Sequence, residues 1–92
     1  MPAVYRTVHH KRGPDGVPVY EIRGDEIYRT IHHPIGAELS ADYEIRQNAV
    51  YRTTHHPAGC QPQPVYEIRD RQIFRTPYHP AGVSGWPDYE IR

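Results

Sequence analysis

One stretch of twenty residues occurs four times in the chain, and each copy follows the previous one at a spacing of 23 residues. The copies occupy residues 4–23, 27–46, 50–69 and 73–92. Eight of the twenty positions are identical in all copies: an Arg-Thr pair, one His, one Gly and the closing Tyr-Glu-Ile-Arg. A fixed period of this size is typical of repeat proteins, in which each unit buries its apolar face against its neighbours. The sequence therefore predicts a single domain, residues 1–92, built from four equal units.

The composition by itself favours a loop-rich chain, with ten prolines, seven glycines and only 37% apolar residues. The apolar residues are nevertheless β-branched or aromatic, and they recur at fixed places in every copy. A disordered chain has no reason to keep such a pattern, whereas β-strands favour these residue types. We therefore expect a folded all-β protein.

Charge and cysteine content narrow the classes of partner. Eleven basic residues balance eleven acidic residues, so no overall field attracts nucleic acid or an anionic membrane. Cys60 is the only cysteine, which excludes a disulfide within the chain and a cysteine-based metal motif. No signal-like segment precedes the first repeat, and no apolar run reaches membrane length. We expect a cytoplasmic protein with neither nucleic-acid nor membrane partners, as a monomer or a homodimer.

Each copy contains two runs with the composition of a short β-strand. In the first copy these are residues 4–8 and residues 19–23. Between them, residues 10–13 correspond to His-Pro-x-Gly in the other copies, and proline followed by glycine in this way is typical of a type I turn. A variable loop follows each turn. The three-residue segments between copies, at 24–26, 47–49 and 70–72, predict tight hairpins.

A three-residue hairpin fixes which side chains face each other. It places Ile22 opposite Tyr28 and Glu21 opposite Arg29, and it likewise pairs Glu44 with Arg52 and Glu67 with Arg75. This register predicts an interior of the closing tyrosines, the isoleucines, the threonines and the aromatic residues Tyr5, Tyr28, Tyr51 and Phe74.

Eight strands joined in sequence by hairpins form an antiparallel meander with two exposed edges. In this meander Glu90 on the last strand and Arg6 on the first each lack a partner, and closing the sheet would pair them. Eight strands is also about the number whose interior side chains fill a barrel. We therefore predict an eight-stranded antiparallel up-and-down barrel. The alternative is an open or propeller-like ring of four hairpins.

A second, weaker period distinguishes alternate copies. The residue before each closing tyrosine is Val19, Asp42, Val65 and Asp88 in turn. One interpretation is duplication of a 46-residue pair of hairpins. The other is that alternate hairpins meet different surroundings.

The invariant histidine is the candidate metal ligand. It is His10, His33, His56 and His79 in the four copies. If the barrel closes, all four turns lie at one end, and imidazoles gathered there are suitable ligands for Zn²⁺ or Ni²⁺. The alternative is that each histidine only hydrogen-bonds its own turn.

Charged and aromatic residues of the repeat are candidate contacts for a glycan or a small anion, in a lectin-like and multivalent arrangement. They are Arg6, Arg29, Arg52, Arg75, Glu21, Glu44, Glu67 and Glu90, together with the single tryptophan, Trp86. The alternative is that the Arg-Glu pairs form a surface ladder and that Trp86 fills a packing gap.

Four nearly identical units repeat the same groups, whereas catalysis needs an asymmetric set of differently tuned groups. No phosphate-binding Gly-rich loop, HExxH motif or repeated nucleophile is present in the sequence. We therefore predict a small non-enzymatic binding or interaction protein whose His-bearing turns form the recognition end. Its ligand is a metal ion, a glycan, another small molecule or a protein. The alternatives are a structural scaffold that self-assembles and a multi-copy peptide precursor.

Overall fold

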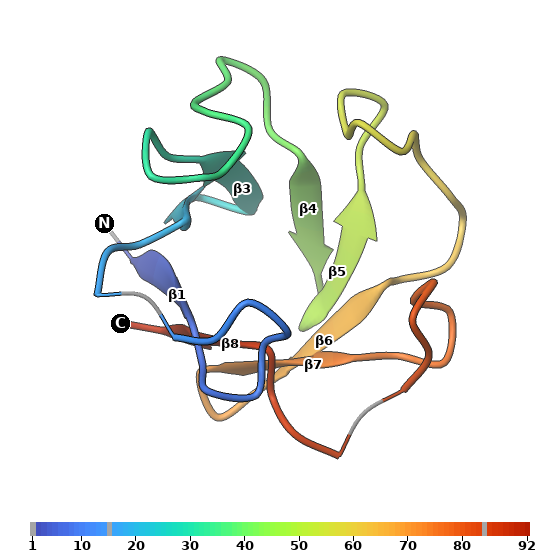
Figure 1. Cartoon of the computed structure of the whole chain (residues 1–92). Helices are drawn as coiled ribbons and strands as arrows, with labels where there is room; N and C mark the ends of the chain where they lie inside the picture. The colour runs from blue at the N-terminus through green and yellow to red at the C-terminus, as the bar shows by residue number, and fades with distance from the viewer. Residues whose placement is uncertain (1, 15, 84) are drawn as a thin grey trace.

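The chain forms a closed antiparallel barrel in the computed structural model, which describes residues 2–14, 16–83 and 85–92 (Figure 1). Each strand pairs with the next, and the last strand pairs with the first. The strands are β1 (Ala3–Arg6), β2 (Tyr20–Arg23), β3 (Glu26–Arg29), β4 (Tyr43–Arg46), β5 (Ala49–Arg52), β6 (Tyr66–Arg69), β7 (Gln72–Arg75) and β8 (Tyr89–Ile91). The predicted up-and-down barrel is confirmed, and the open ring is excluded.

Closure brings the two ends of the chain together, as Figure 1 shows. Ala3 and Arg92 exchange two backbone hydrogen bonds of 2.8 Å. Beyond them, Tyr5 lies opposite Glu90 and Arg6 opposite Tyr89, as in every internal junction between copies. The sheet therefore has no free edge, which removes the usual template for aggregation.

The hairpins between copies have two-residue turns, so the predicted three-residue turns are wrong. Arg23 pairs with Glu26, which leaves only residues 24 and 25 in the turn. Gly24 has φ of 60°, as the first position of a type II′ turn requires. In the other two hairpins both turn residues have positive φ, as in a type I′ turn: Gln47 and Asn48, then Asp70 and Arg71. Both turn types match the twist of paired strands.

Because each turn is one residue shorter than predicted, the side chains of the strand that follows it lie on the face opposite to the predicted one. Ile22 now faces Ile27, and Glu21 faces Tyr28. The β-branched residues that open each copy are consequently buried inside: Val4, Ile27, Val50 and Ile73. The predicted interior positions of Tyr5, Tyr28, Tyr51 and Phe74 are wrong, because these rings lie on the outer face.

Arginine side chains cover the outer aromatic rings. The guanidinium carbon of Arg23 lies 4.4 Å from the centre of the Tyr28 ring, and the other three copies repeat this contact at 4.0 to 4.3 Å. The same arginine forms an ion pair with Glu21 along its own strand, with 2.6 Å between Nη2 and Oε1. The predicted cross-strand pairs Glu44–Arg52 and Glu67–Arg75 are therefore wrong. Glu44 pairs with Arg46, and Glu67 pairs with Arg69.

The centre of the barrel is a ring of four tyrosines. Tyr20, Tyr43, Tyr66 and Tyr89 are buried, and each meets both neighbours edge to face, with centroids 5.8 to 6.0 Å apart. This geometry is the favourable one for aromatic pairs and adds about 0.5–1.5 kcal/mol per pair beyond burial. The tyrosine ring closes the core toward the end of the barrel that carries the His-bearing turns.

The alternation of buried and exposed residues breaks just before each closing tyrosine. Asp42 and Tyr43 are both buried, and the amide of Asp42 donates to the carbonyl of Ile27, the residue paired with Tyr43. Two residues on one strand then face one residue on the other, as in a β-bulge. In every copy the bulge therefore buries the residue before the closing tyrosine, in addition to the tyrosine itself.

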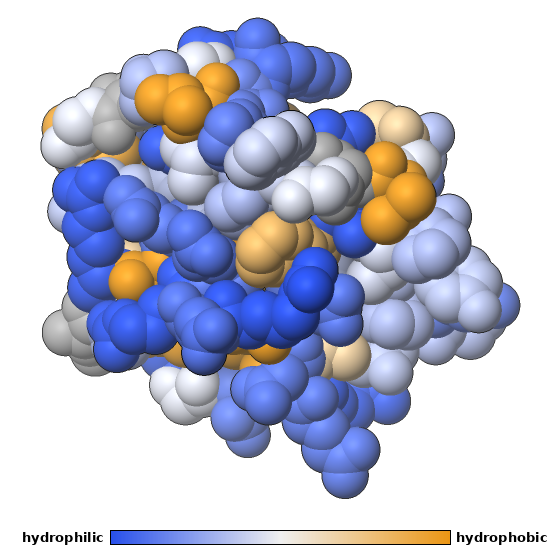
Figure 2. All heavy atoms as spheres, turned by 90° about the horizontal axis from the view of Figure 1, so that it is seen from below, coloured by the Kyte–Doolittle hydropathy of each residue, from blue (hydrophilic) through white to orange (hydrophobic). Residues whose placement is uncertain are grey.

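The surface seen in Figure 2 is mostly hydrophilic, with apolar atoms in separate patches. In the described part of the chain, no helix has the length and apolar character needed to cross a membrane.

Candidate functional site

The invariant threonine and glycine shape the turn that carries the histidine. Thr30 Oγ1 donates to the carbonyl of Pro18 at 2.6 Å and accepts from the amide of His32 at 3.2 Å. The Gly36 amide donates to the carbonyl of His33, and Gly36 has φ of 92°, which favours glycine. The threonine contact recurs in the other copies as Thr7–Pro87, Thr53–Ala41 and Thr76–Pro64. Each turn is thus fastened to the preceding repeat.

The histidine links its turn to the tyrosine ring. Nδ1 of His33 accepts the backbone amide of Ile35 at 3.1 Å, so the ring proton is on Nε2, which donates to the Tyr20 hydroxyl at 3.1 Å. The remaining pairs are His56–Tyr43, His79–Tyr66 and His10–Tyr89, at 3.0 to 3.2 Å. Both ring nitrogens are therefore engaged in every copy.

Burial keeps these groups neutral. Burial first, and nearby arginines second, lower the pKa of His33 and of His56 to about 4. Burial also lowers the pKa of His10 and His79. On the other side of each contact, burial raises the pKa of the tyrosine hydroxyl, to about 12 for Tyr89.

The predicted zinc or nickel site of His10, His33, His56 and His79 finds no support. Among the residues that the structure describes, no three His, Cys, Asp or Glu side chains are grouped to hold a metal ion. The physical reason is that both nitrogens of each imidazole are already engaged, one by a tyrosine hydroxyl of the neighbouring copy and the other by a backbone amide of its turn.

The arginine that precedes the invariant threonine lies at the inner rim of the barrel. In copies 2 and 4 it forms an ion pair with the aspartate of the bulge, Arg29 with Asp42 and Arg75 with Asp88, each with 3.0 Å between Nε and Oδ2. In copies 1 and 3 the bulge residue is valine. The weaker sequence period therefore corresponds to alternating charge at this rim, where the arginines of copies 1 and 3 are Arg6 and Arg52.

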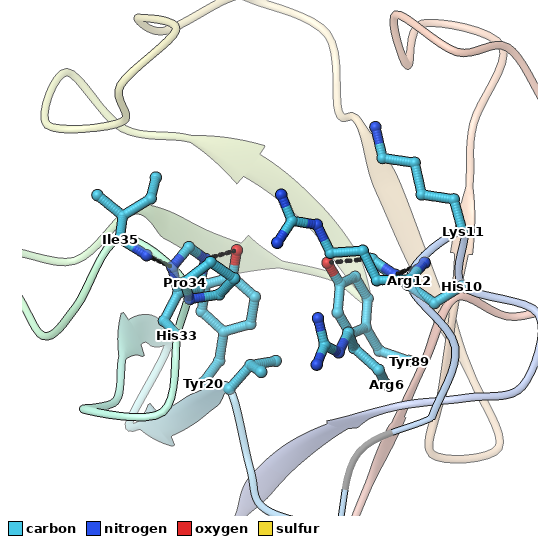
Figure 3. A pocket seen from close by; sticks show the side chains of 10 residues that line it. Arg6, His10, Lys11, Arg12, Tyr20, His33, Pro34, Ile35 and Tyr89 are labelled. Atoms are coloured by element: carbon cyan, nitrogen blue, oxygen red, sulfur yellow. Dashed lines mark hydrogen bonds between the residues drawn. The ribbon is translucent and has the colours of Figure 1, made fainter.

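A pocket of about 190 Å³ opens at this end between the turns of copies 1 and 2 (Figure 3). It is lined by Arg6, Lys11, Arg12, Val19, Pro34 and Ile35 and by the pairs His33–Tyr20 and His10–Tyr89. None of its described lining residues is acidic. Asp88 lines the neighbouring pocket, of about 240 Å³, together with Lys11 and Arg75.

Two larger grooves lie on the flank of the barrel and occupy equivalent places in successive repeats. One, of about 550 Å³, is lined by Arg29 and Glu21; the other, of about 610 Å³, is lined by Arg6, Glu90 and Trp86. Five of the nine residues that the sequence singled out as ligand contacts thus line these two grooves, two in one and three in the other. The other four, Arg52, Arg75, Glu44 and Glu67, hold the same positions in their copies.

The sequence prediction missed the contribution of Lys11 and Arg12. The signal was present, because copy 1 has His-Lys-Arg-Gly where copies 3 and 4 have His-Pro-Ala-Gly. This departure from the repeat places two cations at the end of the barrel.

No protein family model, curated protein or solved structure matches the chain. The class of protein is therefore defined by its own geometry: a four-repeat β-barrel with a cationic pocket at one end and grooves on its flank.

Proposed function

We propose that the protein is a non-enzymatic binding protein, cytoplasmic as expected from its sequence, which holds a small oxyanion in the pocket at its turn end. The observation that carries this proposal is the lining of that pocket by three cations, Arg6, Lys11 and Arg12, in a chain whose total charge is zero. Concentrating one sign of charge in a concave, partly desolvated site raises the local concentration of the opposite ion.

The arrangement of the side chains supports the same ligand. In Figure 3 the guanidinium groups of Arg6 and Arg12 point into the space between the His33–Tyr20 and His10–Tyr89 pairs. A guanidinium donates two parallel hydrogen bonds to a phosphate, sulfate or carboxylate group. The volume of about 190 Å³ fits an anion of that size, since pockets for drug-sized ligands begin at roughly 300 Å³.

The test is a calorimetric titration with inorganic phosphate, sulfate and citrate at neutral pH and low salt. The informative variant is Lys11→Pro with Arg12→Ala, because it installs the His-Pro-Ala-Gly turn that copies 3 and 4 already use. We expect the parent to bind at least one of the three anions. We expect the variant to bind it at least about tenfold more weakly, since one hydrogen bond to a charged group contributes about 1.5–3 kcal/mol.

A reciprocal variant serves as the control. Pro57→Lys with Ala58→Arg adds a second cationic turn in copy 3, beside Arg52, where the bulge residue is again a valine. We expect a second anion to bind. Absence of heat with all three anions in the folded parent, or equal affinity in the Lys11→Pro, Arg12→Ala variant, contradicts the proposal.

A further inference from the structure

We infer that the flank groove beside Trp86 is a saccharide-binding site. It is a different cavity from the pocket at the turn end, although Arg6 lines both. The groove has a volume of about 610 Å³, within the range of roughly 300–1,000 Å³ typical of small-ligand sites. It lies where the last variable loop meets the first turn, and it presents an aromatic side chain beside a row of planar polar side chains.

The aromatic part is a supported indole. The rings of Trp86 and His9 are stacked, with centroids 4.7 Å apart and an angle of 15° between their planes. Trp86 is nevertheless 62% exposed. His9 therefore fixes the plane of the indole while most of the side chain stays accessible. Such a surface is suited to the C–H face of a pyranose ring, because those hydrogens carry partial positive charge and the aromatic face is negative.

The polar part consists of Gln72, Glu90 and Arg92. Gln72 lies directly opposite Glu90 across β7 and β8. The side chain of Arg92 donates two hydrogen bonds to Oε1 of Glu90, from Nη2 at 2.6 Å and from Nε at 3.0 Å, which hold the carboxylate in one orientation and direct Oε2 toward a ligand. An amide, a carboxylate and a guanidinium in fixed positions match the donors and acceptors of neighbouring sugar hydroxyls.

The equivalent groove of the first repeat is the internal comparison. It keeps Glu21 and Arg23 in the places of Glu90 and Arg92. The position of Trp86 is occupied there by Val17, and that of Gln72 by Ala3. The repeated scaffold is thus common to both grooves, whereas the aromatic surface and the amide belong only to the groove beside Trp86. We therefore expect saccharide binding in one groove and not in the other.

The experiment exploits the fact that Trp86 is the only tryptophan in the chain. Its fluorescence is followed while a panel of neutral mono- and disaccharides is added, and binding is measured independently by ligand-observed NMR. We expect a saturable change in emission with at least one sugar, at millimolar concentrations. Trp86→Ala should abolish the NMR signal of the bound sugar, and Glu90→Gln should weaken binding at least about tenfold, as expected for one hydrogen bond to a charged group.

Two variants control for folding and position. Leu39→Ala alters the equivalent groove, where this side chain is 95% exposed, and should leave sugar binding unchanged. Val17→Trp with Ala3→Gln should create a second sugar site. The inference is overturned if no sugar of the panel changes the emission or the NMR signal of the folded parent. It is equally overturned if Trp86→Ala binds sugar as well as the parent does.

Discussion

At the scale of single residues, each invariant position of the repeat has an identifiable partner. The threonine fastens the turn to the preceding copy, and the glycine supplies a positive φ. The histidine joins its own turn to a buried tyrosine of the neighbouring copy, as in His33 with Tyr20. The alternative interpretation of the sequence, in which the histidine hydrogen-bonds its own turn, therefore describes the bond at Nδ1. The bond at Nε2 goes to a tyrosine of another copy, and the sequence does not show this contact.

The neutral histidines make stability depend on pH. In the folded chain burial lowers the pKa of His33 and His56 from 6.5 to about 4. Well above pH 6.5 neither state binds a proton at these groups, and the stabilisation is complete. As the pH falls from 6.5 toward 4, the unfolded chain takes up protons that the folded chain does not, so we expect the free energy of unfolding to decrease.

Urea unfolding at a series of pH values measures this decrease. His33→Gln with His56→Gln should make the free energy of unfolding less dependent on pH, whereas His32→Gln, at the exposed position beside His33, should leave that dependence unchanged. A parent whose stability is constant over this range would contradict the assignment of neutral, Nε2-protonated histidines.

At the scale of elements, the number and order of the strands were predictable and their register was not. The period of 23 residues and the β-branched runs define eight strands. The predicted register relied on an ion pair between Glu21 and Arg29 on the next strand. Glu21 pairs instead with Arg23 on its own strand, and such a pair carries no information about register. Arg29 pairs instead with Asp42, across a bulge that breaks the alternation on which the prediction relied.

The hairpin turns offer a test of the observed register. Arg71 has φ of 65°, in the left-handed region that costs a non-glycine residue about 1–2 kcal/mol. Arg71→Gly should therefore raise the free energy of unfolding by about 1 kcal/mol. Arg71→Ala is the matched control, because it also removes the exposed 3.2 Å contact to the Ile91 carbonyl but keeps the strain. Equal stability of the two variants would show that this turn is not left-handed.

The candidate sites were predictable to a similar extent. Repetition of arginine and glutamate identified groups that line the flank grooves, because equal units place equal residues in equal places. The stacking of Trp86 on His9 joins the last copy to the first and follows only from closure of the barrel. Lys11 and Arg12 depart from the repeat, but their place in one pocket with Arg6 depends on how the turns of copies 1 and 2 approach each other.

At the scale of the whole molecule, closure makes the position of the chain ends arbitrary. Arg92 faces Ala3 as Arg23 faces Glu26, so a two-residue link should join the ends. We expect a circular permutant that begins at Glu26, ends at Asp25 and carries Asn-Gly in place of residues 1 and 2 to keep nearly the stability of the parent. Asn-Gly is the preferred pair for a two-residue hairpin turn.

A permutant that keeps Met1 and Pro2 as the link provides the control. Proline at the second position cannot adopt the positive φ that a type I′ turn needs there. Methionine at the first position does not suit a type II′ turn, which needs glycine there. That permutant should melt at a lower temperature than the Asn-Gly form. Aggregation of the Asn-Gly permutant from a well-behaved parent would argue that the barrel is not closed in solution.

Closure of the barrel by four equal repeats sets how many copies the fold accepts. Each repeat advances the chain by about a quarter turn about the barrel axis, and the four tyrosine rings close on themselves with neighbouring planes inclined at 75° to 80°. Three repeats leave a gap in the ring, and a fifth has no place in it. Two repeats meet the same condition by pairing with a second copy of themselves. A family built on this unit is therefore expected to grow by pairs of hairpins, which is also the period at which aspartate and valine alternate beside the tyrosines.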